Sequence, residues 1–355
     1  MKKVPLHLFL LLTVILSSCS HEDVTDDPSW EGPLKVTKLL PLSNDVPYHL
    51  LGSGKIVFER IYDQERTSFY VIDIDQKKSS GFILNSRMKQ PAISPAGDII
   101  ACALQNSGDA NPAWNIYVMK LDGTGCFPAF ISEQHMHYPV WNDDGSKLFY
   151  YTSGSEGALY MQSPVENSPD RVEVAKFYDP GDPDWLIDPL GRFTVSDSGN
   201  FVSVSTSDTL DGLISIEPYK GKEGVNLLLN PSTDLFFVSP NFSVESPVFS
   251  PDGSFIAFIS LYINPIENSV ISVAISVINP EGNYLASVGA LGGHLPDSRR
   301  PFMSLCWSPD ATKLLFSMPD AENTSHLYVL NLDDSGIFQV TNQPFVRDCN
   351  VSWSK

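Results

Sequence analysis

Short runs of β-branched and aromatic residues, each broken by a tight turn, recur along most of this chain. The clearest case is segment 249–258, which reads Phe-Ser-Pro-Asp-Gly-Ser-Phe-Ile-Ala-Phe. Pro251 presets φ for the second turn position, Asp252 can accept hydrogen bonds from the nearby backbone, and Gly253 takes the positive φ that closes the turn. The flanking residues suit a pleated, half-buried surface. The segment is therefore predicted to form two strands joined by a tight turn.

The same four-residue turn recurs in one register. Copies occupy 94–97, 142–145, 196–199, 250–253 and 308–311, with a degenerate first copy at 51–54 and a truncated last copy at 351–354. The fourth positions of the six turns are 54, 97, 145, 199, 253 and 311. Such intervals indicate a repeat architecture.

Each unit holds four candidate strands. In the second unit these strands are expected at 91–94, 99–103, 116–119 and 128–131. Four strands repeated radially make a propeller blade. Six units therefore predict an all-β chain that forms a six-bladed β-propeller of four-stranded antiparallel blades over residues 34–355. A β-sandwich is the alternative, but a sandwich has no reason to repeat one turn in one register.

The first unit lacks an obvious innermost strand. Its other three strands are expected at 55–58, 69–74 and 81–84. The innermost strand comes either from the C-terminus, at 350–354, or from residues 48–51. We favour the C-terminus because closure there removes open sheet edges. Residues 34–40 are also strand-like, and they either pair with a blade edge or lead in as coil.

The repeat resembles a known family. Ser-Pro-Asp-Gly before Phe-Ile-Ala-Phe, with Tyr-Val-Leu-Asn-Leu-Asp at 328–333, looks like the TolB-like repeat of six-bladed propellers. The resemblance covers about residues 48–355. It departs from the family pattern at Ala311 and at Asn142-Asp143, and it implies a scaffold rather than one function.

The N-terminus has the features of an export signal. Residues 1–18 combine a charged start, a short apolar run and small residues at the end, which is typical of a signal peptide. The sequence Leu-Ser-Ser-Cys at 16–19 resembles the bacterial lipoprotein signal, which implies that Cys19 becomes the lipidated N-terminus. An ordinary secretory peptide with an incidental cysteine is the alternative.

Residues 19–33 are polar and acidic, so they are predicted to form a disordered tether. The segment resembles the acidic sequence that directs lipoproteins of Bacteroidetes to the outer face of the outer membrane. A plain solvated linker explains the same composition. The expected location is the outer membrane, through the lipid anchor, on the periplasmic or the cell-surface side.

The charge of the chain restricts its partners. Removing residues 1–18 takes away two lysines and no acid, so the formal charge moves from −19 to −21. Such an acidic surface argues against nucleic acid and against direct adhesion to anionic lipid. Attachment to a membrane would rest on the acyl chains alone. The propeller is expected to be a monomer.

Four cysteines remain after lipidation: Cys102, Cys126, Cys306 and Cys349. Their spacing matches no metal pattern and no obvious disulfide framework, so their disulfide state stays open. Cys102 occupies the strand position that Phe258 fills in a later unit. It is therefore predicted to be a small core residue.

The loops that enter the innermost strands gather cationic residues. Of eight arginines, five sit just before such a strand: Arg87, Arg192, Arg299, Arg300 and Arg347. Nearby lie Lys89, His135, His137, Tyr138 and His294. These loops share one face of a propeller, so we predict an anion-binding channel rim there, because arginine forks suit carboxylates and phosphates. The alternative is that the arginines pair with the chain's own acids, such as Asp297 or Asp348, and hold blades together.

Gln134-His135-Met136-His137 places two histidines at alternate positions, where a strand lets both face one metal ion. Six-bladed oligogalacturonate lyases of similar repeat type hold a metal with His and Gln, which makes His135, His137 and His294 candidate ligands. The spacing differs from that family, and the other ligands must come from elsewhere. Polar loop histidines without a metal are the alternative, and no cofactor is then expected.

Two further features bear on function. The insertion at 177–189 carries three Asp-Pro steps, with Tyr178 and Trp185 placed to stack on a sugar or peptide or to pack over a blade edge. No Gly-x-Ser-x-Gly nucleophile elbow and no phosphate-binding glycine loop occur. We therefore favour a non-enzymatic envelope binding module for an anionic glycan or a protein partner. A metal-assisted polysaccharide lyase, or another carbohydrate-active enzyme, is the alternative.

Overall fold

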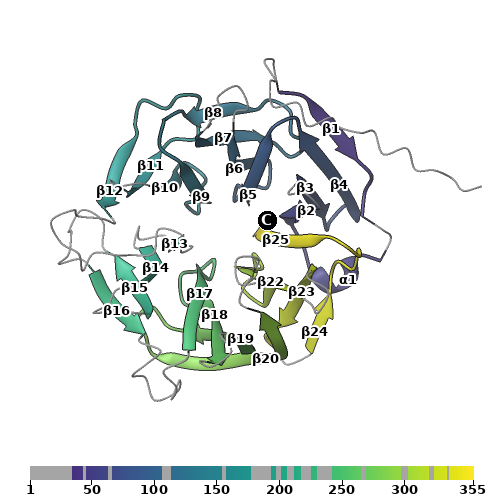
Figure 1. Cartoon of the computed structure of the whole chain (residues 1–355), viewed down its shortest axis with the longest axis vertical. Helices are drawn as coiled ribbons and strands as arrows, with labels where there is room; N and C mark the ends of the chain where they lie inside the picture. Colours follow the sequence, from purple (N-terminus) through teal and green to yellow (C-terminus); the bar gives the residue numbers. More distant parts are fainter. Residues whose placement is uncertain are drawn as a thin grey trace, which may run out of the picture.

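Strands dominate the described part of the chain, and Figure 1 shows their sheets arranged in a ring. The computed structural model describes residues 34–42, 45–62, 66–105, 113–153, 157–176, 193–196, 201–205, 212–216, 225–229, 242–264, 269–296, 303–319, 324–333 and 336–355. The signal peptide, the tether and the insertion at 177–189 lie outside these ranges. Among the described residues, no helix has the length and apolar character needed to span a membrane.

Four antiparallel sheets of four strands follow the chain order. Sheet II holds β5 (Arg87–Ile93), β6 (Ile99–Gln105), β7 (Trp114–Lys120) and β8 (Phe127–Phe130). Sheet III holds β9 (Met136–Trp141), β10 (Leu148–Thr152), β11 (Ala158–Gln162) and β12 (Val172–Lys176). Sheet IV holds β13 (Phe193–Val195), β14 (Phe201–Ser205), β15 (Gly212–Ile216) and β16 (Val225–Leu229). Sheet V holds β17 (Phe242–Phe249), β18 (Ile256–Asn264), β19 (Ser269–Ile278) and β20 (Tyr284–Pro296).

Sheet I has nine strands and contains both ends of the described chain. Its N-terminal strands are β1 (Val36–Leu39), β2 (Lys55–Ile61), β3 (Thr67–Asp73) and β4 (Lys78–Leu84). Its C-terminal strands are β21 (Ser304–Trp307), β22 (Lys313–Pro319), β23 (Ser325–Asn331), β24 (Gly336–Gln339) and β25 (Arg347–Ser354). One parallel pair, Ser325 with Arg347, joins the run β21–β24 to the run that contains β25.

The C-terminal strand supplies the innermost strand beside β2, as the sequence predicted. β25 pairs with β2 in antiparallel register from Lys55 opposite Ser354 to Ile61 opposite Arg347. A side chain on Gly54 would lie 2.0 Å from the Ser354 carbonyl oxygen, so the close approach of the two segments requires glycine. The alternative segment forms the short helix α1 (Tyr48–Leu51) instead. The strand-like piece near residue 36 pairs with the edge of sheet I, as β1 on β4.

Four of the predicted signature turns are confirmed, at 94–97, 142–145, 250–253 and 308–311. Gly97, Gly145 and Gly253 have φ of 68°, 71° and 69°, and Ala311 takes the same left-handed conformation at 54°. In each of these turns the fourth residue donates its backbone N–H to the first residue's carbonyl, as Gly253 does to Ser250 at 2.8 Å. In the degenerate first copy, the Gly54 N–H donates to Asp75 Oδ2 instead. The turn beginning at Ser196 lies mostly outside the described residues.

The hydrophobic core lies between neighbouring sheets. Val57, Phe69 and Phe82 of sheet I pack against Ile100 and Cys102 of sheet II, which places Cys102 in the core as predicted. Equivalent clusters join sheets II and III, sheets III and IV, and sheet V with β21–β23. Because both faces of a sheet are covered in this way, its central strands carry consecutive buried residues instead of alternating ones.

The inner strands have a common direction relative to the ring. β5, β9, β17 and β21 each follow the last strand of the preceding sheet along the chain and finish at a signature turn, and β25 finishes at Ser354. Figure 1 shows these inner strands around the centre of the molecule. We call the two ends of the central space the loop end, where the inner strands begin, and the turn end, where they finish.

Candidate functional site

A cavity of about 540 Å³ runs along the centre of the ring. Residues from the inner strands β5, β9, β13, β17, β21 and β25 line it. Its polar lining includes Gln90, Tyr138, Thr194, Ser246, Asn350 and Ser352. The size and the convergence of polar groups from separate sheets are typical of a ligand site.

The cavity extends to the turn end. Pro95 and Pro251 line it there, together with Asp143, Asp144 and Lys355. Hydrogen bonds from Ser146 hold the pKa of Asp144 below its ordinary value, so this carboxylate is anionic near neutral pH. The signature turns thus contribute to the cavity, although the binding rim predicted from the sequence lies at the loops that enter the inner strands.

A repeated bulge shapes the middle of the cavity. Gln90, Tyr138, Ser246 and Asn350 occupy the same position of four inner strands, and their φ values lie between 49° and 58°. The ladder register shifts at each of these positions, as expected for a β-bulge. Pro91, Pro139 and Pro247 follow three of these residues, and proline in a strand is a signal for such a bulge.

The bulges bind one sheet to the next. Tyr138 donates its backbone N–H to Gln90 Oε1 at 3.0 Å, which links sheet III to sheet II. Gln90 donates its own N–H to Glu59 Oε2 at 2.8 Å, and Asn350 Nδ2 donates to the same oxygen at 2.7 Å. The left-handed residues therefore direct polar groups across the gaps between sheets while their neighbours line the cavity.

Tryptophan side chains make a second set of links close to the turn end. Trp141 Nε1 donates to the Ala92 carbonyl at 3.0 Å, and Trp307 Nε1 donates to the Val248 carbonyl at 3.1 Å. In each case the acceptor belongs to the preceding inner strand. These indoles are almost completely buried. They therefore pack between adjacent sheets and help to fix the distance between them.

The predicted channel rim is only partly described. Arg87 begins β5 and is exposed, and Arg347 begins β25 and is half-buried. Arg192, Arg299 and Arg300 lie outside the described residues, as does Asp297. His294 belongs to β20, but its side chain is not described. Tyr138 is the member of the predicted rim that lines the central cavity.

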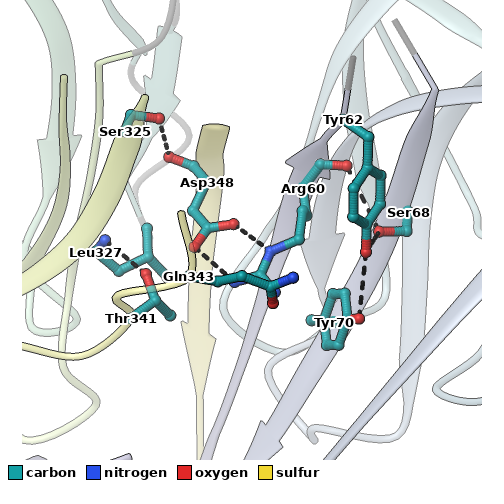
Figure 2. Close-up of polar contacts among 9 residues, drawn as sticks. All are labelled: Arg60, Tyr62, Ser68, Tyr70, Ser325, Leu327, Thr341, Gln343 and Asp348. Carbon is teal, nitrogen blue, oxygen red and sulfur yellow. Dashed lines mark hydrogen bonds and ion pairs between the residues drawn. The ribbon is translucent and has the colours of Figure 1, made fainter. Parts of the chain in front are cut away.

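Asp348 forms an ion pair with Arg60 of β2, an arginine outside the predicted rim (Figure 2). Arg60 Nε and Nη2 donate to the two carboxylate oxygens at 2.6 and 2.8 Å, and Nη1 donates to Gln343 Oε1 at 2.5 Å. Both charged side chains are fully buried. Burial alone would lower the pKa of Arg60, but the Asp348 carboxylate raises it above its ordinary value. Asp348 thus forms an internal ion pair, but its partner is not one of the rim arginines that the alternative named, so the role of those arginines stays a prediction.

The loop end beside β5 and β9 holds a different group of side chains. We call it the Lys89 cluster, and its members are Lys89, Trp114, His135, His137 and Tyr151. Lys89 Nζ lies 4.0 Å from the centre of the Trp114 ring. The Trp114 backbone N–H donates to His135 Nδ1 at 3.2 Å. The two histidine rings stack with centres 6.1 Å apart, and His137 lies 5.3 Å from the Tyr151 ring.

The Lys89 cluster is electrostatically unusual. Burial lowers the pKa of His137 to about 3, and the positive charges of Lys89 and His135 act in the same direction. Burial also lowers the pKa of Lys89, although Glu59 opposes the effect. His137 is therefore neutral at physiological pH, and Nε2 lies 3.3 Å from Ser153 Oγ.

The described residues include two of the metal candidates and all four cysteines of the mature chain. In the described part of the chain, no three His, Cys, Asp or Glu side chains converge as a metal site would require. His135 and His137 share one face, as the predicted strand geometry required. Cys102, Cys126, Cys306 and Cys349 are all free thiols, and burial raises the pKa of Cys126 to about 12.

The architecture is similar to that of proteins with solved structures, although the sequence is not. No protein-family profile matches the sequence, and no curated protein is similar to it. TolB from Acinetobacter baumannii superposes with a TM-score of 0.60 at 14% identity, over 85% of this chain and 66% of that one. The chain is a β-propeller. It spans just under two thirds of the TolB chain. At such low sequence identity, the similarity concerns the fold alone.

Two other solved structures are similar in the same sense. An oligogalacturonate lyase in complex with manganese superposes with a TM-score of 0.51 at 12% identity, over 88% of this propeller and 85% of that chain. Hydrazine synthase from Kuenenia stuttgartiensis superposes with a TM-score of 0.57 at 10% identity, over 85% of this propeller and 46% of that chain. Proteins with unrelated names thus share the architecture, so function has to be argued from the cavity and its surroundings.

Proposed function

We propose that this propeller is a binding module of the bacterial cell envelope and that its ligand enters the central cavity. The cavity formed by six inner strands carries the proposal, because it is a concave, preformed site lined by polar groups from separate sheets. We favour an anionic glycan as the ligand. An acidic segment of a protein partner is the other candidate, because it would carry the same charge. The propeller would act as a monomer.

The proposal includes six blades of four strands. Sheets II to V would each be one blade, and sheet I would be two blades joined by the single pair Ser325–Arg347. One of these contains β25, β2, β3 and β4, with β1 as an extra outer strand. The other contains β21 to β24. Each blade then contributes one inner strand to the cavity, which accounts for its lining.

The charges along the axis favour an acidic ligand in one orientation. Asp143 and Asp144 lie at the turn end, together with Lys355. Arg87 and Lys89 belong to the inner strand at the loop end. A ligand with a carboxylate would be repelled by the two aspartates and attracted toward the loop end, where arginine and lysine suit it.

The cavity can be tested by filling it. Ala96 is exposed and lines the turn end, so Ala96→Trp should obstruct the cavity without disturbing the core. Calorimetric titration with trigalacturonate, and separately with triglutamate, should show binding to the wild type and its loss in the variant. Ser254→Trp is the matched control, because Ser254 is an exposed turn residue outside the cavity lining. Equal binding by both variants would refute the cavity as the ligand site.

The envelope location rests on the sequence around Cys19. If the cysteine carries the lipid, Cys19→Ala should move the protein from the membrane fraction to the soluble fraction of cells. Retention of this variant in membranes would contradict the lipid anchor. The result bears on location alone and leaves the cavity test unaffected.

A metal-assisted lyase is the second candidate function. The stacking of His135 and His137 favours it, as does the similarity to an oligogalacturonate lyase that was solved with manganese. Elemental analysis of the purified mature protein, with His135→Ala/His137→Ala as the control, distinguishes the candidates. Stoichiometric metal that the double variant loses would support the lyase, and acidic polysaccharides would be the first substrates to assay.

A further inference from the structure

We propose that the Lys89 cluster is a carboxylate-binding subsite at the loop end of the central cavity. The inference rests on the proposed function, because the subsite would hold the acidic end of the ligand that enters the cavity. It adds a defined set of residues and a chemical group to that function. Four strands supply the residues: β5, β7, β9 and β10, with His135 just before β9.

Lys89 is a partly buried cation that forms no ion pair with another described residue. The ion pairs found in the described part of the chain are Arg60–Asp348 and Lys147–Asp170. Glu59 is close enough to influence Lys89, but its Oε2 already accepts hydrogen bonds from Gln90 and Asn350. Lys89 instead lies over the Trp114 ring. A cation held in this way retains its capacity to bind an external anion.

His135 supplies a second donor. Its Nδ1 accepts the backbone N–H of Trp114, so in the neutral ring the proton is on Nε2. That N–H is then available to a carboxylate. The same Trp114 therefore positions both donors: its ring carries the ammonium group of Lys89, and its backbone orients the imidazole of His135.

The charge of Lys89 decides between an anion and a metal at this position. The histidine stack is close enough to Lys89 that the ammonium group lowers the pKa of His137. The same positive charge would repel a metal cation on the histidines and would attract a carboxylate. In the described residues no third ligand of His, Cys, Asp or Glu joins the pair. An anion is therefore the ligand that this cluster fits.

Stacked rings connect the cluster to the cavity. Tyr138 lines the cavity, and its ring lies 5.9 Å from that of Tyr151. Tyr151 in turn lies against His137. Lys89 precedes Gln90, which also lines the cavity. Tyr151 itself is buried, so the ring that a ligand in the cavity would contact on this side is that of Tyr138. From there its acidic group can extend to Lys89, the residue next to Gln90.

The experiment observes the histidines directly. Histidine-selective NMR of the mature protein would follow the ring signals of His135 and His137 during titration with glucuronate, N-acetylglutamate or glucose. We expect both acids to shift these signals and glucose to leave them unchanged. The acid that binds more tightly identifies the source of the carboxylate as a sugar acid or a peptide. Absence of a shift with both acids would overturn the proposal.

Two substitutions test the role of the charge. Lys89→Gln keeps an extended stem over Trp114 but removes the ammonium group, so the affinity for the acids should fall about 10-fold. Lys120→Gln, at an exposed position of the same sheet, should leave it unchanged. His135→Gln, in the half-buried segment just before β9, is a second variant that should weaken binding if Lys89→Gln fails to fold. Equal affinities in the wild type and both cluster variants would refute the subsite.

The outcome for the subsite and the outcome for the cavity can be read separately. If glucuronate shifts the histidines while Ala96→Trp leaves trigalacturonate binding intact, the subsite stands and the cavity proposal fails. If Ala96→Trp abolishes binding and the histidines do not respond to either acid, the cavity stands and the subsite is wrong.

Discussion

Arg60 and Lys89 are both cations on strands near the central channel, but their surroundings differ. Arg60 is fully buried, and its guanidinium group is paired with both oxygens of Asp348 and with Gln343. Lys89 is partly buried, rests on Trp114 and forms no ion pair with a described acid. One cation has a complete set of partners within the chain, and the other does not.

The difference separates a structural role from a binding role. A buried ion pair whose hydrogen bonds are satisfied is specific and rigid, and here it joins the C-terminal strand β25 to β2 (Figure 2). A desolvated cation without an anion costs free energy in the unliganded state, and a ligand can recover that cost on binding. Substitution at the Arg60–Asp348 pair should therefore lower the stability of the protein, whereas substitution of Lys89 should weaken ligand binding and change stability little.

The largest effect is expected at the paired site. Asp348→Ala leaves the Arg60 guanidinium group buried without its counter-ion, which should lower the free energy of unfolding by about 3 to 5 kcal/mol. Urea unfolding followed by circular dichroism measures the change. Lys89→Gln should alter the free energy of unfolding by less than about 1 kcal/mol, because it removes a charge that has no ion-pair partner.

A paired replacement is the control for this prediction. Arg60→Met/Asp348→Leu removes both charges at once, so it should be close to neutral, or stabilising by about 1 kcal/mol or more. A double variant as unstable as Asp348→Ala would show that the loss comes from packing and not from the unpaired charge.

The Lys89 cluster should instead affect how the free energy of unfolding depends on pH. The pKa of His137 is about 3 in the folded protein and about 6.5 when unfolded. Between these values the unfolded state binds more protons, so stability is greatest above pH 6.5 and falls as the pH is lowered toward 3. Because solvent reaches part of the ring, we expect this group to contribute on the order of 2 kcal/mol.

Comparing variants isolates that contribution from the carboxylates that titrate in the same range. His137→Gln should flatten the slope of the unfolding free energy against pH between pH 4 and 6. His49→Gln, at an exposed position in α1, should leave the slope as it is in the wild type. Identical slopes in all three proteins would mean that His137 is not held neutral by its surroundings.

The repeat predicted the architecture well because each unit carries the same turn between the same kind of apolar strands. Gly97, Gly145 and Gly253 close turns in one register, and the apolar strands around them have to be covered on both faces. The C-terminal strand completes the ring because an open inner edge beside β2 would leave backbone groups unpaired. These are local requirements, and they are visible in the residues themselves.

The site was less predictable because it depends on contacts between units. Asp348 was correctly suspected of forming an ion pair, but Arg60 lies 288 positions away in the chain, and no local pattern connects the two. The bulges were detectable in principle, since Pro91, Pro139 and Pro247 interrupt three inner strands at the same position. The stacking of Lys89 on Trp114 follows from the pairing of different strands, which the sequence does not display.

A smaller effect tests whether the closing blade is held like the others. Trp353 Nε1 donates to the Ser53 carbonyl across the closure, and Trp141 Nε1 donates to the Ala92 carbonyl beside sheet III, both at 3.0 Å. Substituting either tryptophan by phenylalanine removes a partly buried hydrogen bond, which should cost about 1 kcal/mol. Urea unfolding should give similar losses for the two variants. A much larger loss at Trp353 would show that closure depends on this contact more than on the Arg60 pair.

The smallest effect lies in the turns, at positions that serve neither the closure nor the Lys89 cluster. Ala311 has a φ of 54°, a left-handed conformation that costs a residue with a side chain about 1 kcal/mol. Ala311→Gly should therefore stabilise the protein by up to about 1 kcal/mol, less the greater entropy of glycine in the unfolded chain.

The reverse substitution provides the matched test. At Gly253, φ is 69° and a Cβ would meet no atom within 4 Å, so Gly253→Ala introduces backbone strain without a clash. It should destabilise the protein by about 0.5 to 1 kcal/mol in thermal or urea unfolding. If both substitutions shifted stability in the same direction, the left-handed turn would not be the cause. The alanine in the last full copy would then have to be explained by its contacts with the neighbouring sheet.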